Sequence, residues 1–251
     1  GEATGGNMEI PESAFEDSVN LTSITLPESV TNIGYSAFAD CENLTAVTFS
    51  GNNLLSIGDD AFVGTKLASI ALPASLETIG KNAFRALETL KTVSITGDSA
   101  LSSIGDYAFA GAGITSVALP QTLVSIGEYA FAGTSDLESV TFVGEPANLT
   151  VIRTGAFTES GLTEFSVPKA VTNIELGAFE GAAALSRVNF TTDSLLTAIG
   201  DRAFRGTALD AITLPTGVKT IGNRAFENCS ALTEVTVSGS ALETIGEYAF
   251  T

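Results

Sequence analysis

Few residues of this chain could carry out chemistry, and their types and spacing argue against catalysis. The 251 residues include no histidine, which excludes a Ser–His or Cys–His nucleophile pair and any histidine metal site. No phosphate-binding loop and no dinucleotide-binding fingerprint occurs. Carboxylate pairs such as Asp59 and Asp60 could act as acid and base only inside a cleft. We therefore predict no enzymatic activity and no cofactor.

Acidic residues in three long loops raise the separate question of calcium. Asp98, Glu145 and Asp193 occupy equivalent loops of the repeat described below. Successive loops of this kind should lie about 10 Å apart, whereas calcium–oxygen bonds measure about 2.3–2.6 Å. These carboxylates cannot share one ion, so we predict no dedicated calcium site. Adventitious calcium at the surface is the alternative.

The charge balance bears on the kind of partner. The formal net charge is −18, from 11 basic and 29 acidic residues, and the acids are scattered. Such a field repels nucleic-acid phosphates and anionic lipids, so we predict no nucleic-acid binding. The charge-free run 107–127 is long enough for a membrane span. It contains Pro120 and several serines and threonines and keeps the repeat register, so we predict no membrane insertion of this segment.

An internal repeat accounts for most of the sequence. An Ala-Phe pair recurs at spacings of 22 to 26 residues, and an isoleucine stands five residues before each of its phenylalanines. These are Phe15, Phe38, Phe62, Phe84, Phe109, Phe131, Phe157, Phe179, Phe204, Phe226 and Phe250. A Leu-x-x-Val/Ile-x-Leu/Phe pattern, such as "LTSITL" at 21–26, follows five or six residues after each phenylalanine but the last. Its period-two alternation predicts a short strand.

Each repeat is predicted to hold a strand, a turn, a short extended piece and a tight Gly-x-x-Ala-Phe corner made of one turn of helix or 3₁₀-helix. One unit cannot bury its own apolar side, so the units must stack as coils of a solenoid. Ten coils at about 4.8 Å each give one parallel sheet and an array on the order of 50 Å long. Gly105 and its equivalents should supply either a positive φ or a close backbone approach.

The third residue after each phenylalanine is small in all complete repeats except the one with Leu87, which predicts a cramped interior position. Cys41 and Cys229 both occupy this position, eight coils apart. At about 4.8 Å per coil they lie roughly 40 Å apart, and a disulfide needs Cα atoms within about 7 Å. We expect two buried, unpaired thiols.

Long and short repeats alternate. Short repeats end the strand before a proline, and long repeats insert their extra residues at the same corner. The long loops should therefore line one rim of the solenoid, and insertions gathered on one side often mark a binding face. The rim candidates for partner binding are Asn52, Asn53, Asp98, Glu145 and Asp193.

The outward strand positions supply a second set of candidates. In the first six coils these positions hold only serine, threonine and alanine. The last four coils add Glu164, Arg187, Asn189 and Glu234, which are the best candidates for specific partner contacts. The alternative is that small hydroxyl groups simply satisfy a solvated sheet.

These repeats resemble a known family. The stretch "LTSITLPESVTNIGYSAFADCENL", residues 21–44, is similar to the Treponema pallidum-type leucine-rich repeat of BspA-like proteins, and the resemblance covers residues 10–251. It implies a curved right-handed α/β-type leucine-rich-repeat solenoid, with a concave parallel sheet and short helical or 3₁₀ turns on the convex side. It also implies a secreted or surface-attached protein that adheres to host matrix proteins or other cells. The family offers no catalytic residues.

Residues 1–9 are predicted to be a flexible leader and residues 10–251 a single solenoid, as a fragment of a longer array. End-to-end self-association could cover the open C-terminal coil with Leu242, Ile245 and Phe250. The predicted function is a non-enzymatic protein-interaction or adhesion module at a bacterial cell surface or in secreted form. Its partner would be a protein, such as host extracellular matrix, or another cell surface. The alternative is a structural spacer or stalk that displays another domain.

Overall fold

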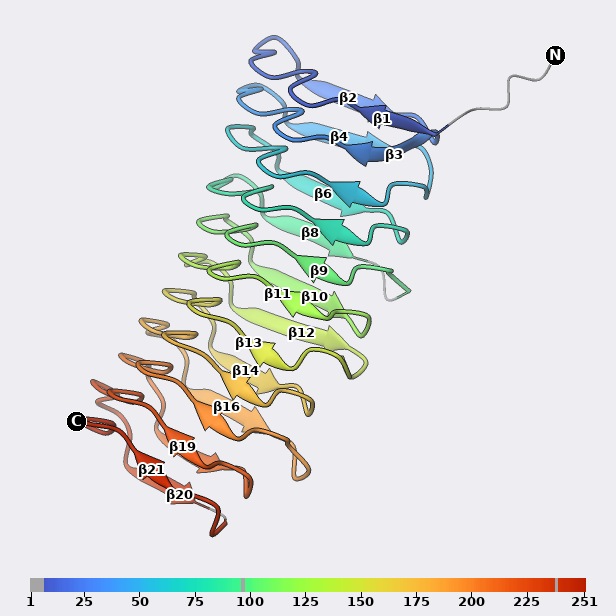
Figure 1. The fold of residues 1–251 in the computed structure, drawn as a ribbon. Helices are drawn as coiled ribbons and strands as arrows, with labels where there is room; N and C mark the ends of the chain where they lie inside the picture. Colours follow the sequence, from blue (N-terminus) through green and yellow to red (C-terminus); the bar gives the residue numbers. More distant parts are fainter. Residues whose placement is uncertain (1–6, 96–97, 238) are drawn as a thin grey trace, which may run out of the picture.

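The chain forms an elongated stack of coils with its two ends at opposite ends of the stack (Figure 1). A computed structural model describes residues 7–95, 98–237 and 239–251. Strand β1, Met8–Ile10, pairs with the next coil, so the solenoid starts inside the predicted leader, of which residues 1–6 lie outside the described residues. No helix in the described residues is long and apolar enough to cross a membrane.

Even-numbered strands of four or five residues alternate along the chain with odd-numbered strands, most of them two residues long, and all strand pairs are parallel. The even-numbered strands come from the Leu-x-x-Val/Ile-x-Leu/Phe pattern. They are β2 Ser23–Leu26, β4 Ala46–Phe49, β6 Ser69–Leu72, β8 Thr92–Ile95, β10 Ser116–Pro120, β12 Ser139–Val143, β14 Glu164–Val167, β16 Arg187–Phe190, β18 Ala211–Leu214 and β20 Glu234–Val237.

The odd-numbered strands end on the isoleucine that precedes each glycine corner, and they form the nearer sheet in Figure 1. They are β1 Met8–Ile10, β3 Val30–Ile33, β5 Ser56–Ile57, β7 Thr78–Ile79, β9 Ser103–Ile104, β11 Ser125–Ile126, β13 Val151–Ile152, β15 Asn173–Ile174, β17 Ala198–Ile199, β19 Thr220–Ile221 and β21 Thr244–Ile245. The coil therefore has two strand-bearing sides where the sequence predicts one.

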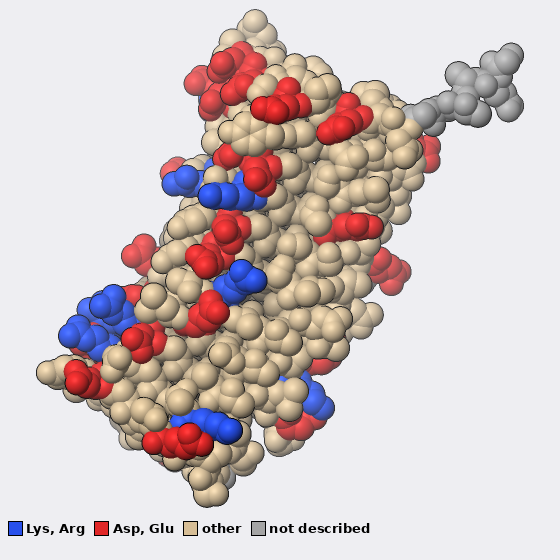
Figure 2. Space-filling view, viewed as in Figure 1, with Lys and Arg blue, Asp and Glu red and all other residues tan. Residues whose placement is uncertain are grey.

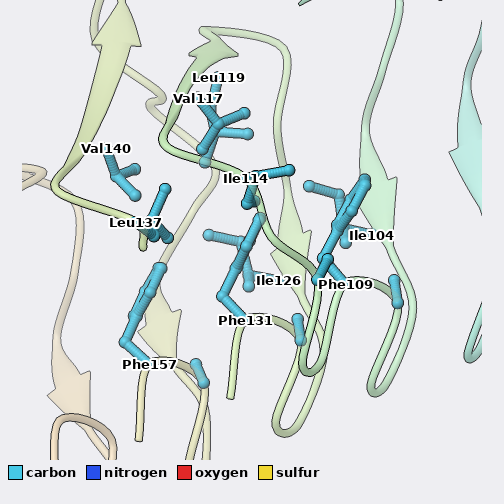
Figure 3. Packing of buried hydrophobic residues seen from close by; sticks show 14 of the residues in the cluster. Ile104, Phe109, Ile114, Val117, Leu119, Ile126, Phe131, Leu137, Val140 and Phe157 are labelled. Carbon is cyan, nitrogen blue, oxygen red and sulfur yellow. The ribbon is translucent and has the colours of Figure 1, made fainter. Parts of the chain in front are cut away.

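The repeated phenylalanines form one ladder from end to end of the solenoid. Successive rings from Phe15 to Phe250 stack with centroids 5.0 to 5.4 Å apart and planes within 1 to 11°. Figure 3 shows three of these rings, Phe109, Phe131 and Phe157, with Ile104 and Ile126 beside them. The offset parallel arrangement is one that aromatic rings prefer, and it confirms the predicted interior ladder.

The corner that carries each phenylalanine consists of consecutive turns, and the described residues contain no helix there. Tyr107 and Gly111 both take left-handed φ angles, of 57° and 68°, which a right-handed helical turn does not allow. The N–H groups of Tyr107, Phe109 and Gly111 donate to carbonyls of the next coil at 2.7 to 2.9 Å. The N–H groups between them, such as that of Ala110, bond three residues back within the corner at 3.0 to 3.3 Å, so the corner is a run of turns linked between coils and not a regular helix.

In most coils the corner position holds a glycine, which allows the backbones of neighbouring coils to pack closely. Gly105 does not have a positive φ, but a Cβ placed on it would lie 2.6 Å from the carbonyl carbon of Gly80 and from the nitrogen of Lys81. Real side chains do not approach backbone atoms so closely. Of the two predicted roles, close approach is therefore the one that the structure shows.

The small residue after each phenylalanine lies in the interior, as predicted. Cys41 and Cys229 are both buried and unpaired. Their thiols donate to the carbonyls of Phe15 and Phe204 in the preceding coils, at 2.9 and 3.1 Å. Burial raises the pKa of the Cys41 thiol. A thiol that is buried, hydrogen-bonded and hard to ionise has a packing role.

The even-numbered strands pair two by two rather than in one continuous sheet. The ladders β2–β4, β6–β8, β10–β12, β14–β16 and β18–β20 keep four or five residue pairs each. Between these ladders, β8 and β10 share one residue pair, and the strands at the other three junctions are not paired. Every interrupted junction follows a long coil, so the longer connection is the feature that these junctions share.

The odd-numbered sheet has a single interruption, between β11 and β13. In the other coils the residue at the corner-glycine position donates its N–H to the isoleucine carbonyl of the preceding coil, as Gly127 does to Ile104 at 2.8 Å. Arg153 stands at this position in the seventh coil, and among the described residues its N–H makes no such bond. Both sheets are therefore open between the sixth and seventh coils, while the phenylalanine corner stays bonded.

Candidate interaction surface

The outward side chains of the even-numbered strands form a polar surface, here called the long-strand face. In β6 the residues Ser69 and Ala71 are exposed, whereas Ile70 and Leu72 are buried. The same alternation holds in β14 and β18. The strand period of two thus places the predicted serine, threonine and alanine positions on the surface.

Two of the four charged or amide candidates on this face lie side by side. Glu164 and Arg187 are register partners in the β14–β16 ladder, and their Oε2 and Nη1 atoms are 3.8 Å apart. Both side chains are more than half exposed, at 58% and 69%. At this separation and exposure the pair contributes little to stability, so both groups are available to a partner.

Asn189 and Glu234 complete the candidates on this face. Asn189 Nδ2 donates to Ser166 Oγ at 3.4 Å, on the same ladder as the Glu164–Arg187 pair. Glu234 lies on β20 and accepts a hydrogen bond from Thr236 at 3.3 Å. Strand β18 separates it from the other three, so the structure gathers three candidates and leaves Glu234 apart.

Two surface hollows flank the β14–β16 ladder, each at an interrupted strand junction. The hollow between β12 and β14 has a volume of about 330 Å³, and Glu164 and Ser166 line it. The hollow between β16 and β18 has a volume of about 350 Å³, and Arg187 and Asn189 line it. The missing strand pairing opens this face on both sides of its charged pair.

The rim loops bring two predicted carboxylates onto one lysine. The backbone N–H of Lys169, in the short coil between two long ones, donates to Glu145 Oε1 at 2.7 Å. The Lys169 ammonium forms an ion pair with Asp193. The hydrogen bond between the Lys169 ammonium and the Asp193 carboxylate raises the pKa of Lys169 and lowers the pKa of Asp193. The positive charge next to these two acidic loops is therefore the ammonium group of Lys169.

The other rim candidates differ in how far they are engaged. Asn52 Oδ1 accepts from the N–H of Ser75 at 3.0 Å, and Asn53 donates to the carbonyl of Glu28 at 3.1 Å. These two amides join neighbouring coils. Asp98 is exposed, and residues 96–97 of its loop lie outside the described residues. Among the described residues no group of three or more potential metal ligands is found.

Charged groups also gather at the corner turns, on the side of the coils away from the rim. Arg205 bridges Glu180 and Glu227 at 2.8 and 2.7 Å, so it joins three successive coils. Arg224 lies 3.7 Å from Glu227 and 5.5 Å from the ring centre of Tyr248. These cations are compensated, which favours a structural role. Figure 2 shows acidic and basic groups mixed along the odd-strand side.

Sequence reasoning missed two residues that the structure places at this surface. Lys169 follows directly after Pro168, and its position between two acidic loops was the available signal. Phe142 is half-buried at the end of β12 and packs edge-on to Phe165 with centroids 6.2 Å apart. Phe142 looked like an ordinary strand residue because three other strands, β4, β8 and β16, have phenylalanine or isoleucine at the equivalent place.

Stacked coils of 22 to 26 residues, with inward leucines and one parallel strand per coil on a shared face, define a leucine-rich-repeat solenoid. The profile of the BspA type leucine rich repeat region matches six copies over residues 8–138 and 150–251. The chain belongs to this family.

Two solved structures with TM-scores above 0.5 show the same fold. A leucine-rich repeat protein from Bacteroides ovatus is 23% identical, with a TM-score of 0.53, over 95% of this chain and 78% of that one. The pneumococcal vaccine antigen PcpA is 24% identical, with a TM-score of 0.56, over 92% of this chain and 67% of that one. The Treponema pallidum leucine-rich repeat protein is 25% identical, with a TM-score of 0.43, over 79% and 69%. Curated proteins give no match.

Proposed function

We propose that this chain is a non-enzymatic protein-interaction and adhesion module of a cell-surface or secreted protein. It binds its partner through the long-strand face and the rim of long loops. Membership of the BspA-type family supports a protein-interaction role in general. The observation that supports this particular surface is the exposed Glu164–Arg187 pair between two hollows. Host extracellular matrix or another cell surface is the proposed partner.

A triple variant tests this surface. Glu164→Ala, Arg187→Ala and Glu234→Ala together remove the charges of the long-strand face. The matched control is Glu128→Ala, Lys81→Ala and Glu247→Ala, which changes two acids and one base on exposed side chains outside this face. Binding is measured to a panel of purified extracellular matrix proteins and to intact bacterial cells.

Loss of binding in the first triple variant, with an unchanged melting temperature and with binding kept in the control, supports the proposal. Equal binding by both variants and the parent would contradict it. In that case the interaction, if any, uses another surface.

The second candidate function is a structural spacer. The observation that favours it is the ring ladder from Phe15 to Phe250, which joins the coils into one continuous stack. The rim amides of Asn52 and Asn53 also join coils. A spacer predicts no captured partner from the panel and equal behaviour of parent and variants.

A further inference from the structure

The junction between β12 and β14 differs from every other junction of the solenoid. The two strands are not paired, and the odd-numbered sheet is also interrupted between the same two coils. The N–H of Thr163 reaches the carbonyl of Glu138 at 3.3 Å, and the equivalent bonds measure 3.4 Å at the β4–β6 and β8–β10 junctions and 2.9 Å within the paired ladders. A hollow of about 330 Å³ is lined by residues of β12, β14 and the loop after β12. That volume is at the lower end of ligand pockets and suits one or two side chains.

One wall of the hollow comes from a segment that the family profile does not match. Strand β12 and the loop after it, residues 139–149, fall between the two ranges that the family profile matches. Phe142, Glu145 and Pro146 belong to this segment and line the hollow. The opposite wall holds Glu164 on the matched strand β14. The hollow therefore lies between a segment that the profile leaves out and a strand that it matches.

The buried part of the lining is apolar, and its exposed edge is acidic. Val140 and Val167 are buried, and Phe142 is half-buried. Glu164 and Glu145 are both exposed, and no lysine or arginine lines the hollow. Glu164 contacts Arg187 only at 3.8 Å, so its carboxylate still has capacity to accept hydrogen bonds. A chain with net charge −18 adds a long-range field of the same sign.

We infer that the hollow between β12 and β14 receives a lysine or arginine side chain from an extended basic segment of the partner protein. This inference rests on the proposed protein-interaction function and adds the chemical class of the partner. The aliphatic stem would lie on Phe142 and Val167, since basic side chains bury their methylenes and keep the charge in water. The charged head would bond to Glu164 in a charge-assisted hydrogen bond.

The second hollow serves as an internal comparison. Between β16 and β18 the lining includes Arg187 and Asp210, so it presents charges of both signs. Arg187 repels a basic side chain there. Site selectivity for the first hollow therefore follows from the charge of the lining, because the two hollows have nearly equal volumes.

The probe is a synthetic peptide of alternating lysine and serine, titrated into ¹⁵N-labelled full chain at low salt. A peptide with norleucine in place of lysine has nearly the same stem without the charge. We expect the lysine peptide to shift the amide signals of β12 and β14, and the norleucine peptide to bind at least tenfold more weakly. Glu164→Gln should weaken lysine-peptide binding about tenfold, and Phe142→Ala several-fold. Glu128→Gln, on an exposed acid outside this face, should leave the affinity unchanged.

Several outcomes overturn the inference. Equal losses in Glu164→Gln and Glu128→Gln would show attraction to the overall negative charge without a site. Shifts confined to other strands, or no lysine-peptide binding up to millimolar concentration, would also overturn it. So would salt-insensitive binding of a neutral oligosaccharide to the hollow in place of the peptide. The matrix-protein panel distinguishes the two proposals. If the triple variant loses binding to a matrix protein but the lysine peptide does not bind the hollow, the interaction function is kept and the lysine inference fails.

Discussion

The Asp106 carboxylate of one coil accepts a hydrogen bond from the backbone N–H of Glu128 in the next coil, with Oδ1 and N 2.8 Å apart. Asp59 and Asp201 make the same bond to the coils that follow them, at 2.7 Å. Asn223 makes it too, to the N–H of Glu247 at 2.8 Å. The third residue of the Ile-Gly-x-x-Ala-Phe corner thus links coils in a ladder of side-chain acceptors.

This bond predicts different outcomes for two substitutions of Asp106. Asp106→Ala removes the acceptor and should lower the free energy of unfolding by about 1 kcal/mol. Asp106→Asn keeps an acceptor oxygen, as Asn223 does naturally, and should lose less than half as much. Urea unfolding followed by circular dichroism measures both, with Glu128→Ala as an exposed control. Equal losses in the two Asp106 variants would show that the hydrogen bond has no measurable effect.

The phenylalanine ladder predicts a position-dependent cost. Phe109→Ala leaves a cavity between two stacked rings and should lower the free energy of unfolding by about 3–5 kcal/mol. Phe250→Ala removes the same atoms from a side chain that is 40% exposed and has one ring neighbour. Its cost should be less than half as large. Similar costs at the two positions would contradict a stability based on burial.

Two glycines of one corner should respond differently to alanine. Gly105→Ala places a Cβ 2.6 Å from backbone atoms of the preceding coil and should be strongly destabilising. Gly111→Ala meets nothing closer than 3.6 Å and costs only the left-handed conformation, about 1–2 kcal/mol. Ala86 already takes φ 58° at the equivalent position. The melting temperature of Gly105→Ala should therefore be lower than that of Gly111→Ala. The reverse order would refute the close-approach role of Gly105.

The Lys169–Asp193 pair predicts a pH window. The pKa of Asp193 is lowered, so its stabilising effect is present above the ordinary carboxyl range, about pH 4, and is lost as the pH falls through the lowered value. The pKa of Lys169 is raised, so its effect is present below the ordinary lysine range, about pH 10.4, and is lost as the pH rises through the raised value.

Asp193→Asn should therefore reduce stability in the neutral range and converge with the parent in strong acid. Both side chains are substantially exposed, at 46% and 60%, so the effect will be small and will fall as salt is added. Parallel denaturation curves of variant and parent between pH 2 and 8 measure it. A constant difference across this range would exclude the ion pair as its source.

The open seam between the sixth and seventh coils predicts fast local hydrogen exchange. The amide of Glu175 bonds to the carbonyl of Ile152 at 2.9 Å, whereas Arg153 lacks the equivalent bond to Ile126. The Arg153 amide should exchange at least tenfold faster than that of Glu175. Amides of the phenylalanine corner in the same coil, such as that of Phe157, should stay protected, because Phe157 donates to Ala178 at 2.8 Å. Equal protection of Arg153 and Glu175 would show that the seam is closed in solution.

Several features of the fold could be predicted because they repeat. A residue type that recurs every 22 to 26 positions must stack on its own equivalent, which placed Phe109 and Cys41 in the interior. The same register placed Glu164 beside Arg187, because both hold the first strand position of adjacent coils. For other features the sequence allowed two interpretations. Gly105, for example, could supply either a positive φ or a close backbone approach. The described residues show turns at the corner and no helix, because alternate N–H groups bond to the next coil and not within the corner.

The sequence by itself thus determined the coil, its interior ladders and the residues that break the repetition, since period and burial follow from side-chain type alone. The tertiary structure decided which neighbouring strands pair, where both sheets open, and that Lys169 links Glu145 and Asp193. Strand pairing depends on backbone displacements of less than an ångström, as the 2.9 and 3.3 Å bonds of Ser186 and Thr163 show. A periodic pattern holds no information about shifts of that size.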